Sequence, residues 1–506
     1  MQLNEVVEAS ASVAGDRSRL RKTAVLAGLL GSASPAELPV VVAWLSGEIP
    51  QGRLGVGWRS LAKLQAAPAD TPSLTVGDVD DALSALAAAT GTGSAARRAE
   101  IIATMFAAAT EPEQRFLVAL LTGELRQGAL AGVMTDAIAK ASGQDLALVR
   151  RAHMLTGSLP VTAGLAVSGG AETLAGVGLE VGRGVSPMLA TPAENLNDAL
   201  TLLGTDVVVD YKLDGARIQV HRRGEDITVY TRTLNDVTTR VPDIVEVVAG
   251  LPCETVILDG ETLTLTDDGR PRPFQETMSR FGSGGAGEPG AERVLRPFFF
   301  DCLHLDGVDL IDRPLAQRLA AIDRIAPDLR IPSVIRPTPA EAAAHFDAAI
   351  ADGHEGVMVK SLAGTYTAGR RGKAWQKVKP VHTFDLVVLG AEWGSGRRTG
   401  FLSNLHLGAR DSGGGAPIMV GKTFKGLTDD LLRWQTEEFP RHETHRDAHT
   451  VHLRPEIVVE IELDGVQRSS RYPGGVALRF ARVVRYRPDK TPEQADTLDT
   501  LRELLK

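Results

Sequence analysis

The chain has 506 residues, of which 43% are hydrophobic and 23% charged, a composition that is ordinary for globular domains and excludes a mainly disordered or collagen-like chain. Its net charge of -8, from 55 basic and 63 acidic residues, argues against a protein that binds polyanions non-specifically over its whole surface. The two cysteines, Cys253 and Cys302, exclude a disulfide framework and a four-cysteine zinc site, and they favour the reducing cytoplasm.

The length predicts about three domains, and the first, residues 1–180, is predicted to be all-helical. It is rich in Ala and Leu, and its apolar residues recur at helical spacing. A basic stretch at residues 17–22 and the apolar run after it resemble a secretion signal, but three acidic residues precede them and the run is short, so an amphipathic helix is expected. No run approaches the roughly 20 apolar residues that span a bilayer. Residues 166–187, rich in Gly, Ser and Val, are predicted to be a linker.

The middle region, residues 186–383, is predicted to be an α+β domain with much antiparallel pairing. From about residue 205 the apolar pattern changes to that of strands. Strands are expected at residues 207–212, 216–221, 227–231, 255–258, 262–266, 297–303 and 356–360, with helices at 314–325 and 339–351. In residues 384–506, short strands at 386–389, 418–420 and 457–461 alternate with Gly-rich turns, which favours a small β-barrel of the OB type.

A possible nucleophile lies in Lys212-Leu213-Asp214-Gly215-Ala216-Arg217, where a lysine ends a buried strand and Asp-Gly makes the turn. A lysine attacks only when it is neutral, and roughly one in a thousand is neutral at about pH 7.4. Nearby cations or a metal would lower its pKa and raise that fraction. A surface hairpin, with Asp-Gly chosen only for its turn, is the alternative interpretation.

Two further motifs, Leu258-Asp259-Gly260-Glu261 and His354-Glu355-Gly356, each place a carboxylate at the start of an apolar strand. Two such acids facing one cleft could hold Mg²⁺ against phosphate oxygens, although each alone is also compatible with an acid in a turn. In residues 371–379, Trp375, Lys377 and Lys379 are two apart and share a face if the segment is a strand. Two lysines on one face repel each other unless an anion lies between them; a solvated basic edge strand is the alternative.

Basic residues cluster at residues 468–490, which hold seven Arg or Lys and one acid, Asp489.

Together the motifs resemble those of the covalent nucleotidyltransferases, and specifically of the ATP-dependent DNA ligases. The matching segments follow the family order: Lys212 to Arg217, Arg232, Asp259 to Glu261, Phe300-Asp301, Glu355 to Lys360, Trp375 to Lys379, and Arg487-Pro488-Asp489-Lys490. Ser186-Pro187-Met188-Leu189-Ala190 resembles the opening of the catalytic domain, and the helical N-terminus resembles the DNA-binding domain of bacterial enzymes of this length.

The resemblance implies a role for each residue. Lys212 would attack the α-phosphate of ATP and carry AMP as a phosphoramide. The nucleotide would be bound by Asp210, where many relatives carry Glu, and by Arg217, Arg232, Glu261, Phe300, Arg371, Lys377 and Lys379. Glu261 and Glu355 would hold Mg²⁺ or Mn²⁺, and Arg482, Arg485 and Lys490 would orient the departing pyrophosphate. Arg126 is a candidate contact to the DNA minor groove.

The resemblance also implies the activity. The enzyme would seal nicks in double-stranded DNA through lysyl-AMP and 5′-adenylated DNA, during replication, repair or recombination. It is expected to be a monomer, to lie in the bacterial cytoplasm in association with the nucleoid, and to need no membrane. Its domains would be the helical DNA-binding domain (1–180), the adenylation domain (186–383) and the OB-fold domain (384–506).

Several other patterns in the sequence allow a second interpretation. Gly52 to Gly57 has the glycine spacing of a dinucleotide loop, but no predicted strand precedes it. His442, His445, His449 and His452 suggest zinc, but charged neighbours favour a solvated helix or loop. Cys302 is expected to be a buried core thiol. An RNA ligase or an mRNA-capping guanylyltransferase is disfavoured by the helical N-terminus, and an NAD-dependent ligase by the missing zinc site. A non-catalytic DNA-binding relative would have lost Lys212, Glu261 or Lys377, and all three are present.

Overall fold

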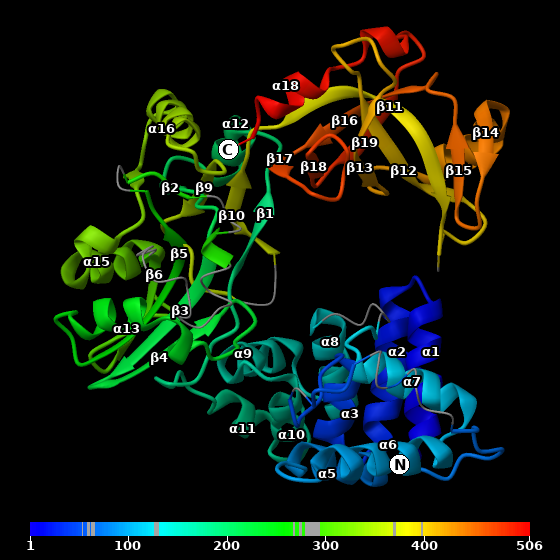
Figure 1. Ribbon diagram of the computed structural model, residues 1–506. Coiled ribbons are helices and arrows are strands. Elements are labelled where there is room, and N and C mark those ends of the chain that lie inside the picture. Colours follow the sequence, from blue (N-terminus) through cyan, green and yellow to red (C-terminus); the bar gives the residue numbers. More distant parts are fainter. Residues whose placement is uncertain are drawn as a thin grey trace.

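The computed structural model describes residues 1–52, 54–57, 61, 66–125, 131–266, 269–272, 276–278, 294–367, 371–395 and 398–505. Three lobes follow one another in chain order around an open arc: a helical lobe, a central lobe of two sheets, and a sheet-rich C-terminal lobe (Figure 1). The multidomain architecture predicted from the sequence is therefore confirmed at this level. Among the helices described, none is long and apolar enough to cross a membrane.

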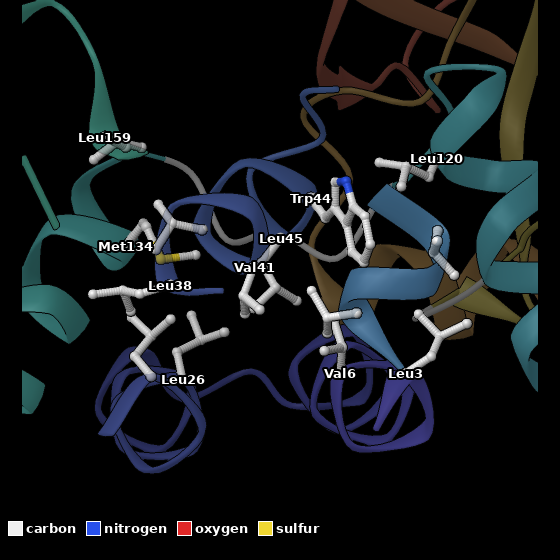
Figure 2. Close-up of a cluster of buried hydrophobic side chains, with 14 of the residues drawn as sticks. Leu3, Val6, Leu26, Leu38, Val41, Trp44, Leu45, Leu120, Met134 and Leu159 are labelled. Carbon is white, nitrogen blue, oxygen red and sulfur yellow. The ribbon is translucent and has the colours of Figure 1, made fainter. Parts of the chain in front are cut away.

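The N-terminal lobe consists of helices packed around one apolar core. The helices are α1 (Leu3–Gly15), α2 (Arg19–Ser32), α3 (Leu38–Leu45), α5 (Val76–Ala88), α6 (Ser94–Ala108), α7 (Glu111–Leu121), α8 (Ala131–Ser142), α9 (Leu146–Thr156), α10 (Leu159–Ser168) and α11 (Gly170–Ala175). Figure 2 shows part of this core, where Leu3 and Val6 of α1, Leu26 of α2 and Trp44 of α3 are buried together. The basic stretch at residues 17–22 lies at the start of α2, which is the amphipathic helix that was expected.

The predicted linker is shorter and better anchored than its composition suggests. Its first part is helical, because α10 and α11 continue to Ala175. The remainder is tied to the central lobe: the Gln219 side chain accepts a hydrogen bond from the Val185 N–H at 2.7 Å and donates one to the Val185 carbonyl at 3.0 Å. The Gly182 N–H donates to His221 Nδ1 at 3.0 Å. Burial lowers the pKa of His221 to about 3, so this ring stays a neutral acceptor.

The central lobe contains two sheets, each of five strands within the described residues. The first has the order β1-β10-β9-β2-β8 and the second β4-β3-β5-β6-β7. The strands are β1 (Leu189–Pro192), β2 (Val207–Tyr211), β3 (Ala216–Arg223), β4 (Asp226–Thr231), β5 (Thr255–Thr264), β6 (Leu295–Leu305), β7 (Val308–Asp309), β8 (Ser333–Ile335), β9 (Val357–Ser361) and β10 (Arg371–Val378). The helices are α12 (Leu196–Leu203), α13 (Pro242–Ala249), α15 (Leu315–Ile325) and α16 (Pro339–Ala351).

One strand differs from the prediction. Residues 255–258 and 262–266 were expected to be two strands with a turn acid between them, but β5 runs without interruption from Thr255 to Thr264. The pairing with β6 shifts between Asp259 and Gly260, where Phe300 of β6 is the extra residue, so the bulge lies in β6 and β5 itself is continuous. A Cβ at Gly260 would lie 2.6 Å from the Phe298 carbonyl oxygen. The glycine therefore permits close strand contact and does not mark a turn.

The C-terminal lobe is built on one sheet, in which seven strands are described. Its central path is β13-β12-β11-β15-β14, with β16 pairing both β11 and β19, and β17 pairs β18 separately. The elements are β11 (His382–Trp393), β12 (Leu402–Ala409), β13 (Ile418–Thr423), α17 (Asp429–Glu438), β14 (Glu443–Arg446), β15 (Thr450–Leu453), β16 (Val458–Leu463), β17 (Gly465–Arg468), β18 (Val476–Arg479), β19 (Arg482–Tyr486) and α18 (Leu498–Arg502). Across residues 382–395 and 398–505, the described pairings do not close into a barrel.

The histidine-rich segment is only partly the expected helix or loop: His442 ends a short 3₁₀ helix and His449 lies in a bend, but His445 and His452 lie on paired strands. β14 and β15 pair antiparallel, and the His445 and His452 rings stack with their centroids 4.2 Å apart. Ring stacking across the ladder stabilises a hairpin that the charged composition did not indicate. Cys302, in contrast, is fully buried as expected.

Candidate functional site

A cavity of about 590 Å³ lies between the two sheets of the central lobe. Seven of the residues selected from the sequence line it: Asp210, Lys212, Arg217, Arg232, Glu261, Phe300 and Lys377. They come from β2, β3, β5, β6 and β10 and from the residues that directly follow β2 and β4. Residues that are scattered over more than 160 positions of the chain therefore meet at one place.

Lys212 is positioned where the segment that follows β2 crosses the segment that precedes β9, and backbone hydrogen bonds hold this crossing together. Its backbone N–H donates to the Gly356 carbonyl at 2.8 Å, and its own carbonyl accepts from the Glu355 N–H at 2.9 Å. Gly356 has a φ of 135°, and a Cβ there would lie 2.2 Å from the Val378 carbonyl oxygen. Only glycine fits this crossing without a shift of the backbone. The crossing places the Lys212 ammonium in a short ion pair with the Glu355 carboxylate.

Glu355 is the centre of a charge network. Its carboxylate contacts Lys212 and also Lys379 Nζ at 2.9 Å. Burial alone would raise the pKa of Glu355, but the two ammonium groups lower it to about 2. Glu355 is therefore a carboxylate at neutral pH and a weak proton acceptor.

Glu261 is a carboxyl group with the opposite shift. It is half-buried in the cavity wall, and desolvation raises its pKa to about 7 against the opposing effect of Lys212 and Arg217. The two predicted metal-binding acids thus differ in how readily they hold a proton.

Arg217 is held by partners that the sequence did not reveal. Its guanidinium donates two hydrogen bonds to Asp259, at 3.0 and 2.7 Å, and a third to the Met188 carbonyl at 2.7 Å. The Tyr366 hydroxyl donates to Asp259 at 2.7 Å and accepts from the Met188 N–H at 3.0 Å. Asp259 had been noted only as part of its motif, and Tyr366 carried no signal, because the contact joins positions that lie 107 residues apart.

Lys360 is a second residue whose place in the site was not predicted. Its side chain lines the cavity and forms an ion pair with Asp210, with 2.7 Å between Nζ and Oδ2. The signal was present, since Lys360 ends the Glu355 to Lys360 motif, but the sequence alone could not show which carboxylate it meets.

Comparisons with known proteins decide the family. Three family models match in order: "DNA ligase N terminus" over residues 59–139, "ATP dependent DNA ligase domain" over 187–379, and "ATP dependent DNA ligase C terminal region" over 398–490. A probable DNA ligase of Rhodococcus jostii (strain RHA1) is 64% identical over 505 residues, which cover 100% of both chains. The chain belongs to the ATP-dependent DNA ligases. A probable DNA ligase of Nocardia farcinica (strain IFM 10152) is 59% identical, also over 100% of both chains.

The same overall fold occurs in a solved structure, Pmar-Lig_PreS3. It is 18% identical, has a TM-score of 0.61, and the match covers 95% of the ligase and 99% of that chain. As a member of this family, the protein is an enzyme that joins DNA and uses ATP.

The structure does not bring every selected residue to the cavity of this ligase. Arg482 is exposed, Arg485 pairs with Glu460 at 2.7 Å, and Lys490 pairs with Asp385; all of these partners lie in the C-terminal lobe. Lys379 contacts Glu355 and also Asp464 of that lobe at 3.0 Å. Arg126 lies outside the described residues, and for Arg371 the backbone in β10 alone is described.

A different arginine of the C-terminal lobe reaches the catalytic region. Arg479 Nη1 lies 3.0 Å from Asp214, and its Nη2 lies 3.5 Å from Glu355. Arg479 belongs to the basic cluster at residues 468–490, and nothing in the sequence distinguishes it from the other arginines there.

Proposed function

We propose that this ligase seals nicks in double-stranded DNA in three steps that begin at Lys212. The observation that carries the proposal is the placement of Lys212 in one cavity with Arg217, Glu261 and Lys377. A lysine among phosphate-binding cations and a buried carboxyl is the arrangement that nucleotidyl transfer requires, because this reaction depends on positioning and charge neutralisation.

In the first step, Lys212 Nζ attacks the α-phosphorus of ATP, the bond to the β-phosphate oxygen breaks, and pyrophosphate leaves. An oxygen of the DNA 5′-phosphate then attacks the AMP phosphorus and releases the lysine. Finally the 3′-hydroxyl attacks the 5′-phosphate and AMP leaves. Glu355, with its pKa near 2, orients the Lys212 ammonium before the reaction and is a poor base for removing its proton.

The nucleotide is held by the residues of the cavity wall. Phe300 stacks on the base, Asp210 accepts from its edge, and Arg217 and Arg232 contact the ribose or phosphates. Lys377, Lys379 and Arg371 neutralise the α-phosphate region. The two hydrogen bonds from Arg217 to Asp259 support this assignment. They fix one edge of the guanidinium group, while the Arg217 side chain still lines the cavity.

Glu261 and Glu355 fit a divalent cation. Carboxylate oxygens are the ligands that Mg²⁺ and Mn²⁺ prefer, and the raised pKa of Glu261 reflects a buried acid with too little positive charge around it. When bound, Mg²⁺ would neutralise charge on the phosphate oxygens.

The C-terminal lobe is proposed to be of the OB type and to supply Arg482, Arg485 and Lys490 to the departing pyrophosphate after a movement of the lobe. The N-terminal lobe is proposed to bind DNA, with Arg126 at the minor groove. Contacts should be mostly to the DNA backbone, since a nick sealer acts at any sequence.

The proposed domain limits remain 1–180, 186–383 and 384–506. The proposed setting is a monomer in the cytoplasm, at the nucleoid, in replication, repair or recombination.

The test of this function is the covalent adduct. Incubation with α-labelled ATP and Mg²⁺ should label the chain through Lys212 far more efficiently than α-labelled GTP does, and NAD⁺ should not label it. Lys212→Ala should abolish the adduct and still bind nicked DNA. The matched control is Lys422→Ala, because Lys422 also forms an ion pair with a carboxylate, Glu392, but lies in the C-terminal sheet. An adduct that maps to another lysine would overturn the assignment.

A further inference from the structure

The ion pair of Lys360 and Asp210 lies on one face of the first sheet. β2 and β9 are antiparallel neighbours, with Val208 opposite Lys360 and Asp210 opposite Met358. Residues directly opposite each other in an antiparallel ladder project to the same side. Trp375 of β10 is opposite Lys360 on the other flank. Asp210, Lys360 and Trp375 therefore share the face that lines the cavity.

Both charged groups are almost completely removed from water. The side chains of Lys360 and Asp210 are 2% and 1% exposed. The Lys360 ammonium lies 4.3 Å from the centroid of the Phe300 ring and 4.4 Å from that of Trp375, distances at which aromatic faces stabilise a cation. The lysine is thus held in place by three partners at the floor of the site.

Other charges nearby do not compete for this lysine. Asp301 is buried close to it, but Arg318 donates to both Asp301 oxygens, at 2.6 and 3.1 Å. Asp210 also faces His345 of α16, whose ring packs on Tyr211 with their centroids 4.6 Å apart. Burial lowers the pKa of His345, so this ring is neutral near pH 7 and Lys360 is the cation that compensates Asp210.

The Asp210 carboxylate still has acceptor capacity. Neither of its oxygens has a hydrogen-bond partner of good geometry among the described residues; the contact with Lys360 is an ion pair. An ionised carboxylate only accepts hydrogen bonds. Removing Lys360 would take away the group that holds this buried carboxylate in place at the floor of the cavity.

We infer that Lys360 is a positioning residue for base selection: by pairing with Asp210 it holds that carboxylate in place as the hydrogen-bond acceptor at the floor of the cavity. The floor of the cavity then receives a purine edge that donates an exocyclic amine, as adenine does, and repels one that presents an oxygen there, as guanine does. This inference rests on the proposed role of the cavity as the nucleotide site. Discrimination of this kind is strong where a site pairs one substrate and leaves the other unpaired.

The experiment compares kcat/KM for adduct formation with α-labelled ATP and α-labelled GTP on the full chain. Lys360→Met removes the charge and keeps the length of the side chain, and Lys360→Arg retains a cation. The ATP-to-GTP ratio should fall by about 10-fold or more in Lys360→Met, and Lys360→Arg should restore most of it. Asp210→Asn, which has both a donor and an acceptor, should lower the ratio to a similar extent. The control Lys422→Met also removes a lysine from an ion pair with a carboxylate, and should leave the ratio unchanged.

The ratio is independent of the fraction of folded protein, because both rates come from one preparation. If Lys360→Met does not fold, the double variant Lys360→Met with Asp210→Asn removes both charges, and it should show the same loss of discrimination. A ratio within about twofold of the wild type in the folded variant would overturn the inference. A wild-type chain that forms no AMP adduct would instead overturn the proposed function itself.

Discussion

Glu261 and Glu355 show how the surroundings of a residue decide its chemistry. Both are glutamates in the same region, but Glu355 lies between two ammonium groups and has a pKa of about 2, whereas burial raises that of Glu261 to about 7. The same reasoning applies to the arginines of the C-terminal lobe. Arg479 lies beside Asp214 and Glu355, and Arg485 is 64% exposed beside Glu460. Their equal charge therefore does not imply equal roles.

The proposed pyrophosphate residues can be separated from DNA-binding residues by assaying single steps. Replacing Arg485 and Lys490 with Ala should slow formation of the AMP adduct by roughly 10³-fold, by analogy with arginine fingers, because they act only while pyrophosphate departs. Sealing of a nick that already carries AMP on its 5′-phosphate should be spared by comparison. If the rates of both reactions fell equally, these residues would instead bind DNA. Arg482→Ala alone should give a smaller effect in the same direction.

At the scale of the element, the site depends on how closely strand ends approach. The crossing of the segments that follow β2 and precede β9 holds Lys212 against Glu355, and Gly356 is the point of contact. The regular ladder of β3 and β5 has a similar effect: Arg217 lies opposite Glu261, and Asp259, two residues earlier on β5, lies on the same face and pairs with Arg217. Catalytic groups on strands of a packed core are held more rigidly than groups on loops.

A methyl group at Gly356 should disrupt this crossing. In Gly356→Ala the new Cβ would lie 2.2 Å from the Val378 carbonyl oxygen, at a φ of 135°, so we expect a loss of about 2 kcal/mol or more in the free energy of unfolding. Adduct formation should fall even at temperatures where the variant is folded.

The control is Gly28→Ala in α2, an exposed helical position where a Cβ meets nothing within 4 Å. It should be stabilising by about 0.5–1 kcal/mol. Thermal or denaturant unfolding of both variants gives the comparison, and a Gly356→Ala protein as stable and active as the wild type would contradict the role of the crossing.

For the whole molecule, the three lobes are connected by specific contacts. Met154 and Leu155 of α9 belong to the core of the central lobe, and Arg151 pairs with Asp312 at 2.6 Å. Lys379 and Arg479 connect the central and C-terminal lobes through Asp464, Asp214 and Glu355. If the lobes are to enclose a nucleic acid, Lys379 and Arg479 must give up these carboxylate partners before they can pair with phosphates.

Binding to nicked duplex should depend strongly on salt. If the lobes contact about 6–10 phosphates, the logarithm of the affinity should fall linearly with the logarithm of the salt concentration, with a slope of about -5 to -9. Adenylation without DNA should depend much less on salt, because the charges of the cavity are partly buried and salt screens buried charges less than exposed ones. Fluorescence anisotropy and the adduct assay, measured over the same salt series, test this. A slope shallower than about -2 would contradict extensive backbone contact.

The sequence by itself determined the family, the order of the lobes, most strands of the central lobe and the residues around Lys212. The strands could be predicted because their periodicity is a local property of the sequence. The site residues could be predicted because the motifs lie at strand ends, which the fold of this family brings together. Tertiary structure alone decided the pairings of Lys360 with Asp210, Tyr366 with Asp259, and Arg479 with Asp214. Tyr366 and Asp259 are 107 positions apart in the chain, and Arg479 and Asp214 are 265 positions apart. Which of many similar charges meet across such distances depends on strand register, bulges and packing, and no local pattern encodes it.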